Sequence, residues 1–120
     1  MCLSSYWVRC VAFKPDNANI LVSGSNDKTI KVWDMPSGSC LSTLNVDAGT
    51  FGVQSVSFSP KGDMVAAGCY NGNIFFVDAA AGEIKSSLNV GGQVSSVEWS
   101  PCGSKMAATC KVYCLSLIHI

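Results

Sequence analysis

The chain has 120 residues, of which 48% are hydrophobic and 13% are charged, so it is suited to one small folded domain rather than a disordered tail. Eight basic and eight acidic residues balance to a net charge of zero, and the basic residues are scattered singly. This balance gives no basis for electrostatic binding of nucleic acid or of an anionic membrane, and we expect neither as a partner.

Neither a membrane span nor a secretory leader is predicted. No apolar run approaches the roughly 20 residues that a spanning helix requires. The first residues also lack the basic stretch of a signal peptide. We therefore expect a cytoplasmic or nuclear location, in which cysteines stay reduced.

The seven cysteines are odd in number and irregularly spaced, which indicates thiols that fill small apolar spaces. A metal site on Cys110 and Cys114 is the alternative. It needs two further ligands, and neither a second close cysteine pair nor a histidine other than His119 offers them. We expect no metal and no cofactor.

In chain order, the first predicted elements are four short strands separated by turns. The first is β-branched and aromatic and ends at a turn that contains Pro15 and Asp16, because proline fixes φ and aspartate bonds backbone amides. The third alternates polar and apolar residues, as a strand does. The predicted strands are residues 8–13, 20–23, 29–33 and 40–46. Together they predict an antiparallel four-stranded unit.

The same pattern recurs twice farther along the chain. Each copy has Val, two residues, Val, one residue, an aromatic residue, one residue and Pro, and the copies begin at Val8, Val53 and Val94. Four strands in about 40 to 45 residues is the period of a propeller blade. Residues 74–77 are consecutively apolar, whereas a sheet with one wet face alternates. We therefore expect sheets that are covered on both faces, as stacked blades are.

Residues 7–110 resemble the WD-repeat family of β-propellers, most specifically in the stretch SGSNDKTIKVWD, which ends in Trp33 and Asp34. The resemblance implies an all-β fold, a partial β-propeller of four-stranded antiparallel blades with two blades and an incomplete third. We place the first blade at residues 1–46, the second at 47–90 and the incomplete third at 91–110. Residues 111–120 form an atypical tail whose end, CLSLIHI, fits no fourth strand and resembles read-through sequence.

Blades of this family often contain a hydrogen-bonded relay of a loop His, a strand Ser or Thr, a turn Asp and a strand Trp. Ser23, Asp27 and Trp33 match three of these positions, and no histidine precedes any of the three copies. The second copy has Ala67, Asn71 and Val77 in their places. We expect that blade to be held by packing, with Phe75 and Phe76, rather than by a polar network.

The resemblance further implies a rigid platform that binds other proteins. Partners of the family usually dock on the face that carries the loops before the first strands and the turns between the second and third strands. The matching residues of this chain are Tyr6, Trp7, Arg9, Phe51, Gln54 and Gln93, with Asn26, Lys28, Tyr70 and Asn71 in the turns. Tyr, Trp and Arg dominate interface energies, so the Tyr6-Trp7 pair is the first candidate. The alternative is that Trp7 and Phe51 pack between blades.

No catalytic constellation is evident. Most carboxylates lie in or beside predicted turns, no pair is singled out for acid–base chemistry, and the cysteines lack a histidine partner. We therefore predict an interaction scaffold without enzymatic activity. The alternatives are an enzyme domain on a propeller frame and a truncated product without a function of its own.

Propellers close with about four to eight blades, and this sequence supplies about two and a half. A piece of a larger propeller is the favoured interpretation, and a ring of several chains is the other. The expected partners are other proteins and the remaining blades of a full propeller.

Overall fold

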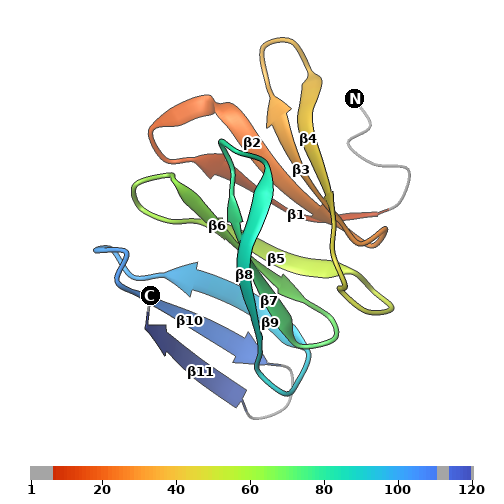
Figure 1. Ribbon diagram of the computed structural model, residues 1–120, viewed down its shortest axis with the longest axis vertical. Helices are drawn as coiled ribbons and strands as arrows, with labels where there is room; N and C mark the ends of the chain where they lie inside the picture. The colour runs from red at the N-terminus through yellow and green to blue at the C-terminus, as the bar shows by residue number, and fades with distance from the viewer. Residues whose placement is uncertain (1–6, 111–113, 120) are drawn as a thin grey trace.

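The computed structural model describes residues 7–110 and 114–119, and for residue 110 and residues 114–119 it describes the backbone. The described residues form eleven strands joined by turns (Figure 1). The first four are β1 (Val8–Lys14), β2 (Asn17–Ser25), β3 (Thr29–Asp34) and β4 (Ser39–Asn45). Then follow β5 (Val53–Phe58), β6 (Met64–Cys69), β7 (Asn73–Asp78) and β8 (Glu83–Asn89). The last three are β9 (Val94–Trp99), β10 (Lys105–Cys110) and β11 (Cys114–His119).

The strands form three antiparallel sheets that follow one another in chain order. Strands β1 to β4 make the first sheet, β5 to β8 the second, and β9 to β11 the third. Each sheet is a meander in which consecutive strands are hydrogen-bonded neighbours, as Figure 1 shows. The first strands lie side by side, because β1 contacts β5 and β5 contacts β9. The predicted all-β architecture of four-stranded antiparallel blades is confirmed.

The second sheet is covered on both faces. Phe75 and Val77 pack in a cluster shared with the first sheet, while Ile74 and Phe76 pack in a second cluster shared with the third. Phe76 meets Trp99 edge to face, with 6.1 Å between ring centroids. Neighbouring residues of one strand thus bury side chains in opposite directions, which explains why β7 is apolar without alternation.

Two glycines on β2 and β6 let the sheets approach closely. A Cβ atom placed on Gly24 would stand 2.5 Å from Cγ1 of Val53, and one placed on Gly68 would stand 2.4 Å from Cγ1 of Val94. The corresponding residue of β10 is Thr109, which pairs with Ser96 as Gly68 pairs with Ser55. Thr109 is exposed. The outer face of the third sheet therefore lacks the glycine on which the two internal contacts depend.

The third sheet extends beyond the point at which we expected it to end. The backbone of β11 pairs with β10 in continuous antiparallel register, from Lys105 opposite His119 to Cys110 opposite Cys114. Strand β11 is thus the third strand of this sheet, whereas we expected residues 111–120 to form a tail outside the blade. The physical reason is that β10 offers a free row of backbone groups, and the apolar run of residues 114–119 can pair with it.

Candidate functional site

Loop and strand residues from all three sheets gather around one hollow at the end where β1 and β5 begin. The hollow has a volume of about 220 Å³ and is lined by Arg9, Phe51, Gln54, Tyr70 and Gln93. Arg9 lies on β1, Gln54 lies on β5, Tyr70 follows β6, and Gln93 directly precedes β9. All five lining residues are among the ten that the sequence indicated for partner binding. Of the others, Trp7 lies against Arg9, and Tyr6 lies outside the described residues. The turns after β2 and β6 contain Asn26, Lys28 and Asn71.

Arg9 is the cationic residue of the hollow. Its guanidinium carbon lies 5.8 Å from the ring centroid of Trp7 and 5.9 Å from that of Phe51, distances at which a cation and an aromatic face attract. Its Nε donates a hydrogen bond to Oδ1 of Asn26 at 2.5 Å. Within residues 7–110, no carboxylate forms an ion pair with Arg9. Among the described residues, the guanidinium therefore contacts two rings and an amide, and no carboxylate neutralises it.

The aromatic residues around Arg9 differ in exposure. Trp7 is 74% exposed, while its carbonyl oxygen accepts hydrogen bonds from the backbone N–H of Asn26 and the hydroxyl of Ser25, both at 3.0 Å. Phe51 is 45% exposed and meets Tyr70 edge to face, with 4.8 Å between centroids. The backbone of Trp7 is thus fixed while its indole remains at the surface. Neither ring is fully enclosed between the sheets.

The two glutamines complete the polar lining. Gln54 donates from Nε2 to the carbonyl oxygen of Phe51 at 2.7 Å, which holds the loop before β5 against the strand. Gln93 lines the hollow from the loop before β9. Together with Arg9 they place amide and guanidinium groups around an aromatic wall. Such a lining can orient a polar or anionic group of a binding partner.

An amide network braces the same end of the second sheet. Asn71 donates from Nδ2 to the carbonyl oxygen of Asp47 at 2.9 Å, and its Oδ1 accepts from the backbone N–H of Asn73 at 3.1 Å. Asn89 donates from Nδ2 to Oδ1 of Asn73 at 2.8 Å. The second sheet thus has the packing expected through Phe75 and Phe76, and in addition an exposed amide network that was not expected. Asn73 and Asn89 were missed, although they are register partners on adjacent strands.

In the first sheet, two of the three predicted relay residues meet directly. The buried indole N–H of Trp33 donates to Oγ of Ser23 at 3.0 Å. Oδ1 of Asp27 accepts from the backbone N–H of Thr29 at 3.0 Å and from its hydroxyl. Asn71 bonds Asn73 in the same way, so its amide retains the turn-closing role of Asp27 in the second sheet.

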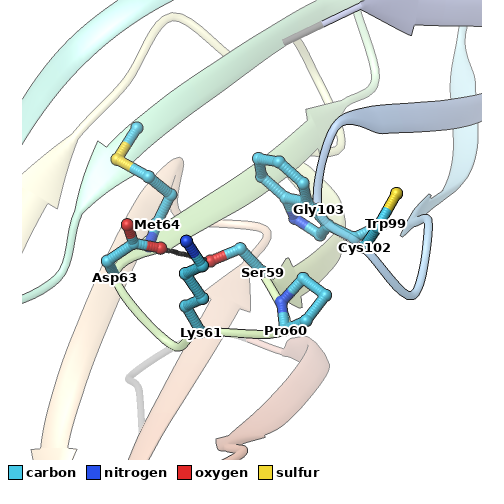
Figure 2. A pocket seen from close by; sticks show the side chains of 8 residues that line it. All are labelled: Ser59, Pro60, Lys61, Asp63, Met64, Trp99, Cys102 and Gly103. Carbon is cyan, nitrogen blue, oxygen red and sulfur yellow. Dashed lines mark hydrogen bonds between the residues drawn. The ribbon is translucent and has the colours of Figure 1, made fainter.

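A second hollow, at the opposite end of β5, has a volume of about 170 Å³ (Figure 2). There the hydroxyl of Ser59 donates to Oδ1 of Asp63 at 2.7 Å, and this hydrogen bond lowers the pKa of Asp63. Asp63 thus stays ionised, as a turn carboxylate does, and is unsuited to donate a proton near neutral pH.

Cys102 lies on the β9–β10 turn beside the same hollow. Hydrogen bonds from Ser100 and Ser104 lower the pKa of its thiol to about 7.

The described part of the chain contains neither a cluster of metal ligands nor a membrane-spanning helix. No group of three or more His, Cys, Asp and Glu side chains there is arranged around a possible metal ion. Nor do residues 7–110 and 114–119 contain a helix of the length and apolarity needed to cross a bilayer. The side chains of Cys110 and Cys114, the alternative metal ligands, lie outside the description.

Comparison with known proteins identifies the repeats. Residues 2–34 match the family model for the WD domain, G-beta repeat, and residues 45–102 match that for the anaphase-promoting complex subunit 4 WD40 domain. The small ribosomal subunit protein RACK1y of Oryza sativa subsp. japonica is 32% identical over 96 residues, which are 79% of this chain and 28% of that protein.

Two fungal proteins show similar agreement. MST50-interacting protein 11 of Pyricularia oryzae is 32% identical over 98 residues, or 81% of this chain and 30% of that protein. The small ribosomal subunit protein RACK1 of Neurospora crassa is 31% identical over 96 residues, or 79% of this chain and 30% of that protein. The chain thus spans about 30% of the length of the curated relatives it matches. With three antiparallel sheets and matches to two WD-repeat models, the chain belongs to the WD-repeat family.

Proposed function

We propose that the chain is part of a protein-interaction platform, and that partners dock on the end that carries the hollow around Arg9. The observation that carries this proposal is the convergence of Arg9, Tyr70 and Gln93 from three sheets on one surface. Arg and Tyr are the residue types that dominate interface energies, and both lie beside aromatic rings that a partner can cover. The name of one relative, MST50-interacting protein 11, agrees with a role in protein binding.

The exposure of Trp7 supports its inclusion in this surface. The indole of Trp7 is 74% exposed beside a cationic side chain, so it is not enclosed between the first and second sheets. A large amphipathic ring held at the surface by its own backbone contacts can bury apolar area on a partner without a large loss of side-chain entropy. Trp7 and Arg9 would therefore act together at the edge of the docking face.

The test is selection of binding peptides from a displayed library of random short peptides, with the 120-residue chain as bait. Trp7→Ala and Tyr70→Ala should each weaken the selected peptides by roughly tenfold or more, the effect of losing an interface residue worth over 1 kcal/mol. Leu41→Ala is the control, because Leu41 is 56% exposed and lies outside the docking end.

The circular-dichroism melt of Trp7→Ala should stay within a few degrees of the parent chain. A large drop in Tm would make Trp7 a structural residue and remove it from the site. Failure to select any peptide whose binding depends on these residues would contradict the docking proposal as a whole.

We also propose that a further blade covers the outer face of the first sheet. On β5 and β9 the equivalent residues are buried against the preceding sheet: Val56 is 8%, Phe58 7%, Val97 5% and Trp99 8% exposed. On β1 the corresponding Val11 and Phe13 are 51% and 57% exposed. The blade that covers β1 would have a face of small and apolar residues, like the face of the first sheet that packs on the second and the face of the second that packs on the third.

A second copy of this chain is disfavoured as that blade. Packing its third sheet on β1 would put Thr109 where Gly24 and Gly68 make room for a valine. A Cβ at those two positions comes within 2.5 Å of the valine side chain, so the same geometry cannot form. A different blade, from a longer propeller, therefore fits better than a ring of identical chains.

We propose a binding role without catalysis, because the hydroxyl–carboxylate pairs described above, such as Ser59 with Asp63, lie in turns that these hydrogen bonds close. Of the two locations expected from the sequence, we propose the cytoplasm, because two relatives are named as small ribosomal subunit proteins. Detectable hydrolase turnover of the purified chain, abolished by one carboxylate substitution, would overturn the assignment.

A further inference from the structure

We propose that the hollow around Arg9 takes one carboxylate side chain, aspartate or glutamate, of a peptide segment in the partner protein. This inference rests on the proposed docking function and adds to it the chemistry of the group that is recognised. It follows from the charge in the hollow, from the direction in which the guanidinium is held, and from the groups that surround it.

The charge of the hollow is unbalanced. Its five lining residues comprise one cation, two aromatic rings and two neutral amides, with no carboxylate among them. Asp27, in the turn between β2 and β3, and Asp47, in the loop before β5, have other contacts, since Asp27 accepts from Thr29 and Asp47 accepts from Asn71. Arg9 is the one cation among the five lining residues, so the hollow suits a singly charged anion.

The guanidinium of Arg9 is oriented by the hydrogen bond of its Nε and by two aromatic rings. Nε is engaged by Asn26, and the plane lies within cation–π distance of Trp7 and Phe51. Within the described residues, neither terminal nitrogen has a hydrogen-bond acceptor. Two parallel N–H donors therefore remain for a carboxylate, which is the bidentate geometry that arginine favours. The ordering of the side chain by its neighbours reduces the entropy lost on binding.

The remaining lining groups suit a carboxylate attached to a short apolar stem. Phe51 and Tyr70 form an edge-to-face pair that can contact the methylene groups of the partner's acidic side chain. Covering these rings would lower the local dielectric and strengthen the charge-assisted hydrogen bonds. The amide of Gln93 can donate to a carboxylate lone pair that Arg9 leaves unused. A doubly charged phosphate calls for further cations, and the hollow contains one.

The experiment uses the peptides selected by the 120-residue chain. Aspartate and glutamate should be enriched at one position of the peptides that bind the parent chain, and this enrichment should disappear when Arg9→Gln is the bait. Replacing that acidic residue by its amide in a synthetic peptide should weaken binding to the parent chain by roughly tenfold to hundredfold, the range for a hydrogen-bonded charge. The same replacement should have little effect on binding to Arg9→Gln.

Lys61→Gln is the matched control, because it removes the same unit of charge at the opposite end of β5 and should leave acidic selection intact. Arg9→Lys tests the fork: charge alone should recover less than half of the lost binding free energy. A peptide with phosphoserine at the acidic position should bind more weakly than the glutamate peptide, and tighter binding would overturn the choice of carboxylate. Peptides that depend on Tyr70 but show no acidic preference would overturn this inference while leaving the docking function standing.

Discussion

Gly68 on β6 and Val94 at the start of β9 stand so close that a Cβ on Gly68 would lie 2.4 Å from Cγ1 of the valine. The approach of the third sheet to the second depends on the missing side chain. Gly24 and Val53 repeat the relationship one sheet earlier, at 2.5 Å. Equivalent glycines thus set the spacing at both internal contacts.

Gly68→Ala should therefore destabilise the chain by about 1–3 kcal/mol, the usual cost of overpacking a filled core. Urea denaturation followed by circular dichroism measures the change in unfolding free energy. The double variant Gly68→Ala with Val94→Ala should recover part of the lost unfolding free energy, because alanine at position 94 leaves room for the new methyl group. An additive double variant would mean that the two residues do not interact.

The hydrogen bond from the indole of Trp33 to Ser23 should contribute measurably to stability. Ser23→Ala leaves a buried N–H unpaired and should cost about 1–3 kcal/mol. In a Trp33→Phe background there is no indole N–H, so the same serine change should cost much less. The double-mutant cycle by urea unfolding separates this bond from general packing, and equal costs in both backgrounds would contradict it.

Self-association of the 120-residue chain is expected, because Val11 and Phe13 expose an apolar face on β1. Light scattering should show species larger than a monomer, and Val11→Thr with Phe13→Lys should shift them toward the monomer. Leu41→Thr serves as a control, since Leu41 is as exposed but does not belong to that face. A sharp monomer of the parent chain with cooperative unfolding would refute the expectation.

Cys102 should be the most readily alkylated of the described thiols. Hydrogen bonds from Ser100 and Ser104 stabilise the thiolate and lower the pKa to about 7, so the rate should rise with pH through about 7 and then level off. Burial raises the pKa of Cys69 to about 12, and that thiol should stay unmodified in the folded chain.

The measurement is the rate of iodoacetamide labelling at each cysteine as a function of pH, resolved by peptide mass spectrometry. Ser104→Ala removes a hydroxyl 2.9 Å from the Cys102 sulfur, so it should move the midpoint to higher pH. An unchanged midpoint would exclude the Ser104 hydroxyl as the cause.

Strands were predictable because each carries its own signal. The alternation of residues 29–33 and the turn at Pro15 fix local structure without reference to distant segments, and the structure confirms a strand at the first place and a turn at the second. Strand β11 was missed because the third repeat departs from the spacing of the others after residue 110. Pairing with β10 is a tertiary effect, which local spacing does not report.

The site was predictable in membership but not in arrangement. Family position indicated Arg9, Gln54, Tyr70 and Gln93 one at a time. That the guanidinium would lie against Phe51 depends on the contact between β1 and β5, which arises from packing. The asparagine network was missed for the same reason, since Asn71 and Asp47 are 24 residues apart in sequence.

The amide network beside the hollow should respond to salt differently from the binding of an anion by Arg9. Asn71, Asn73 and Asn89 are neutral, so their short hydrogen bonds are little affected by mobile ions. The attraction between exposed Arg9 and an anion is screened over a Debye length of about 8 Å at physiological ionic strength. Raising the salt concentration should therefore weaken capture of an acidic peptide while the shape of its receptor stays constant. Ionic strength would therefore change how much acidic peptide is bound without changing the structure of the binding hollow.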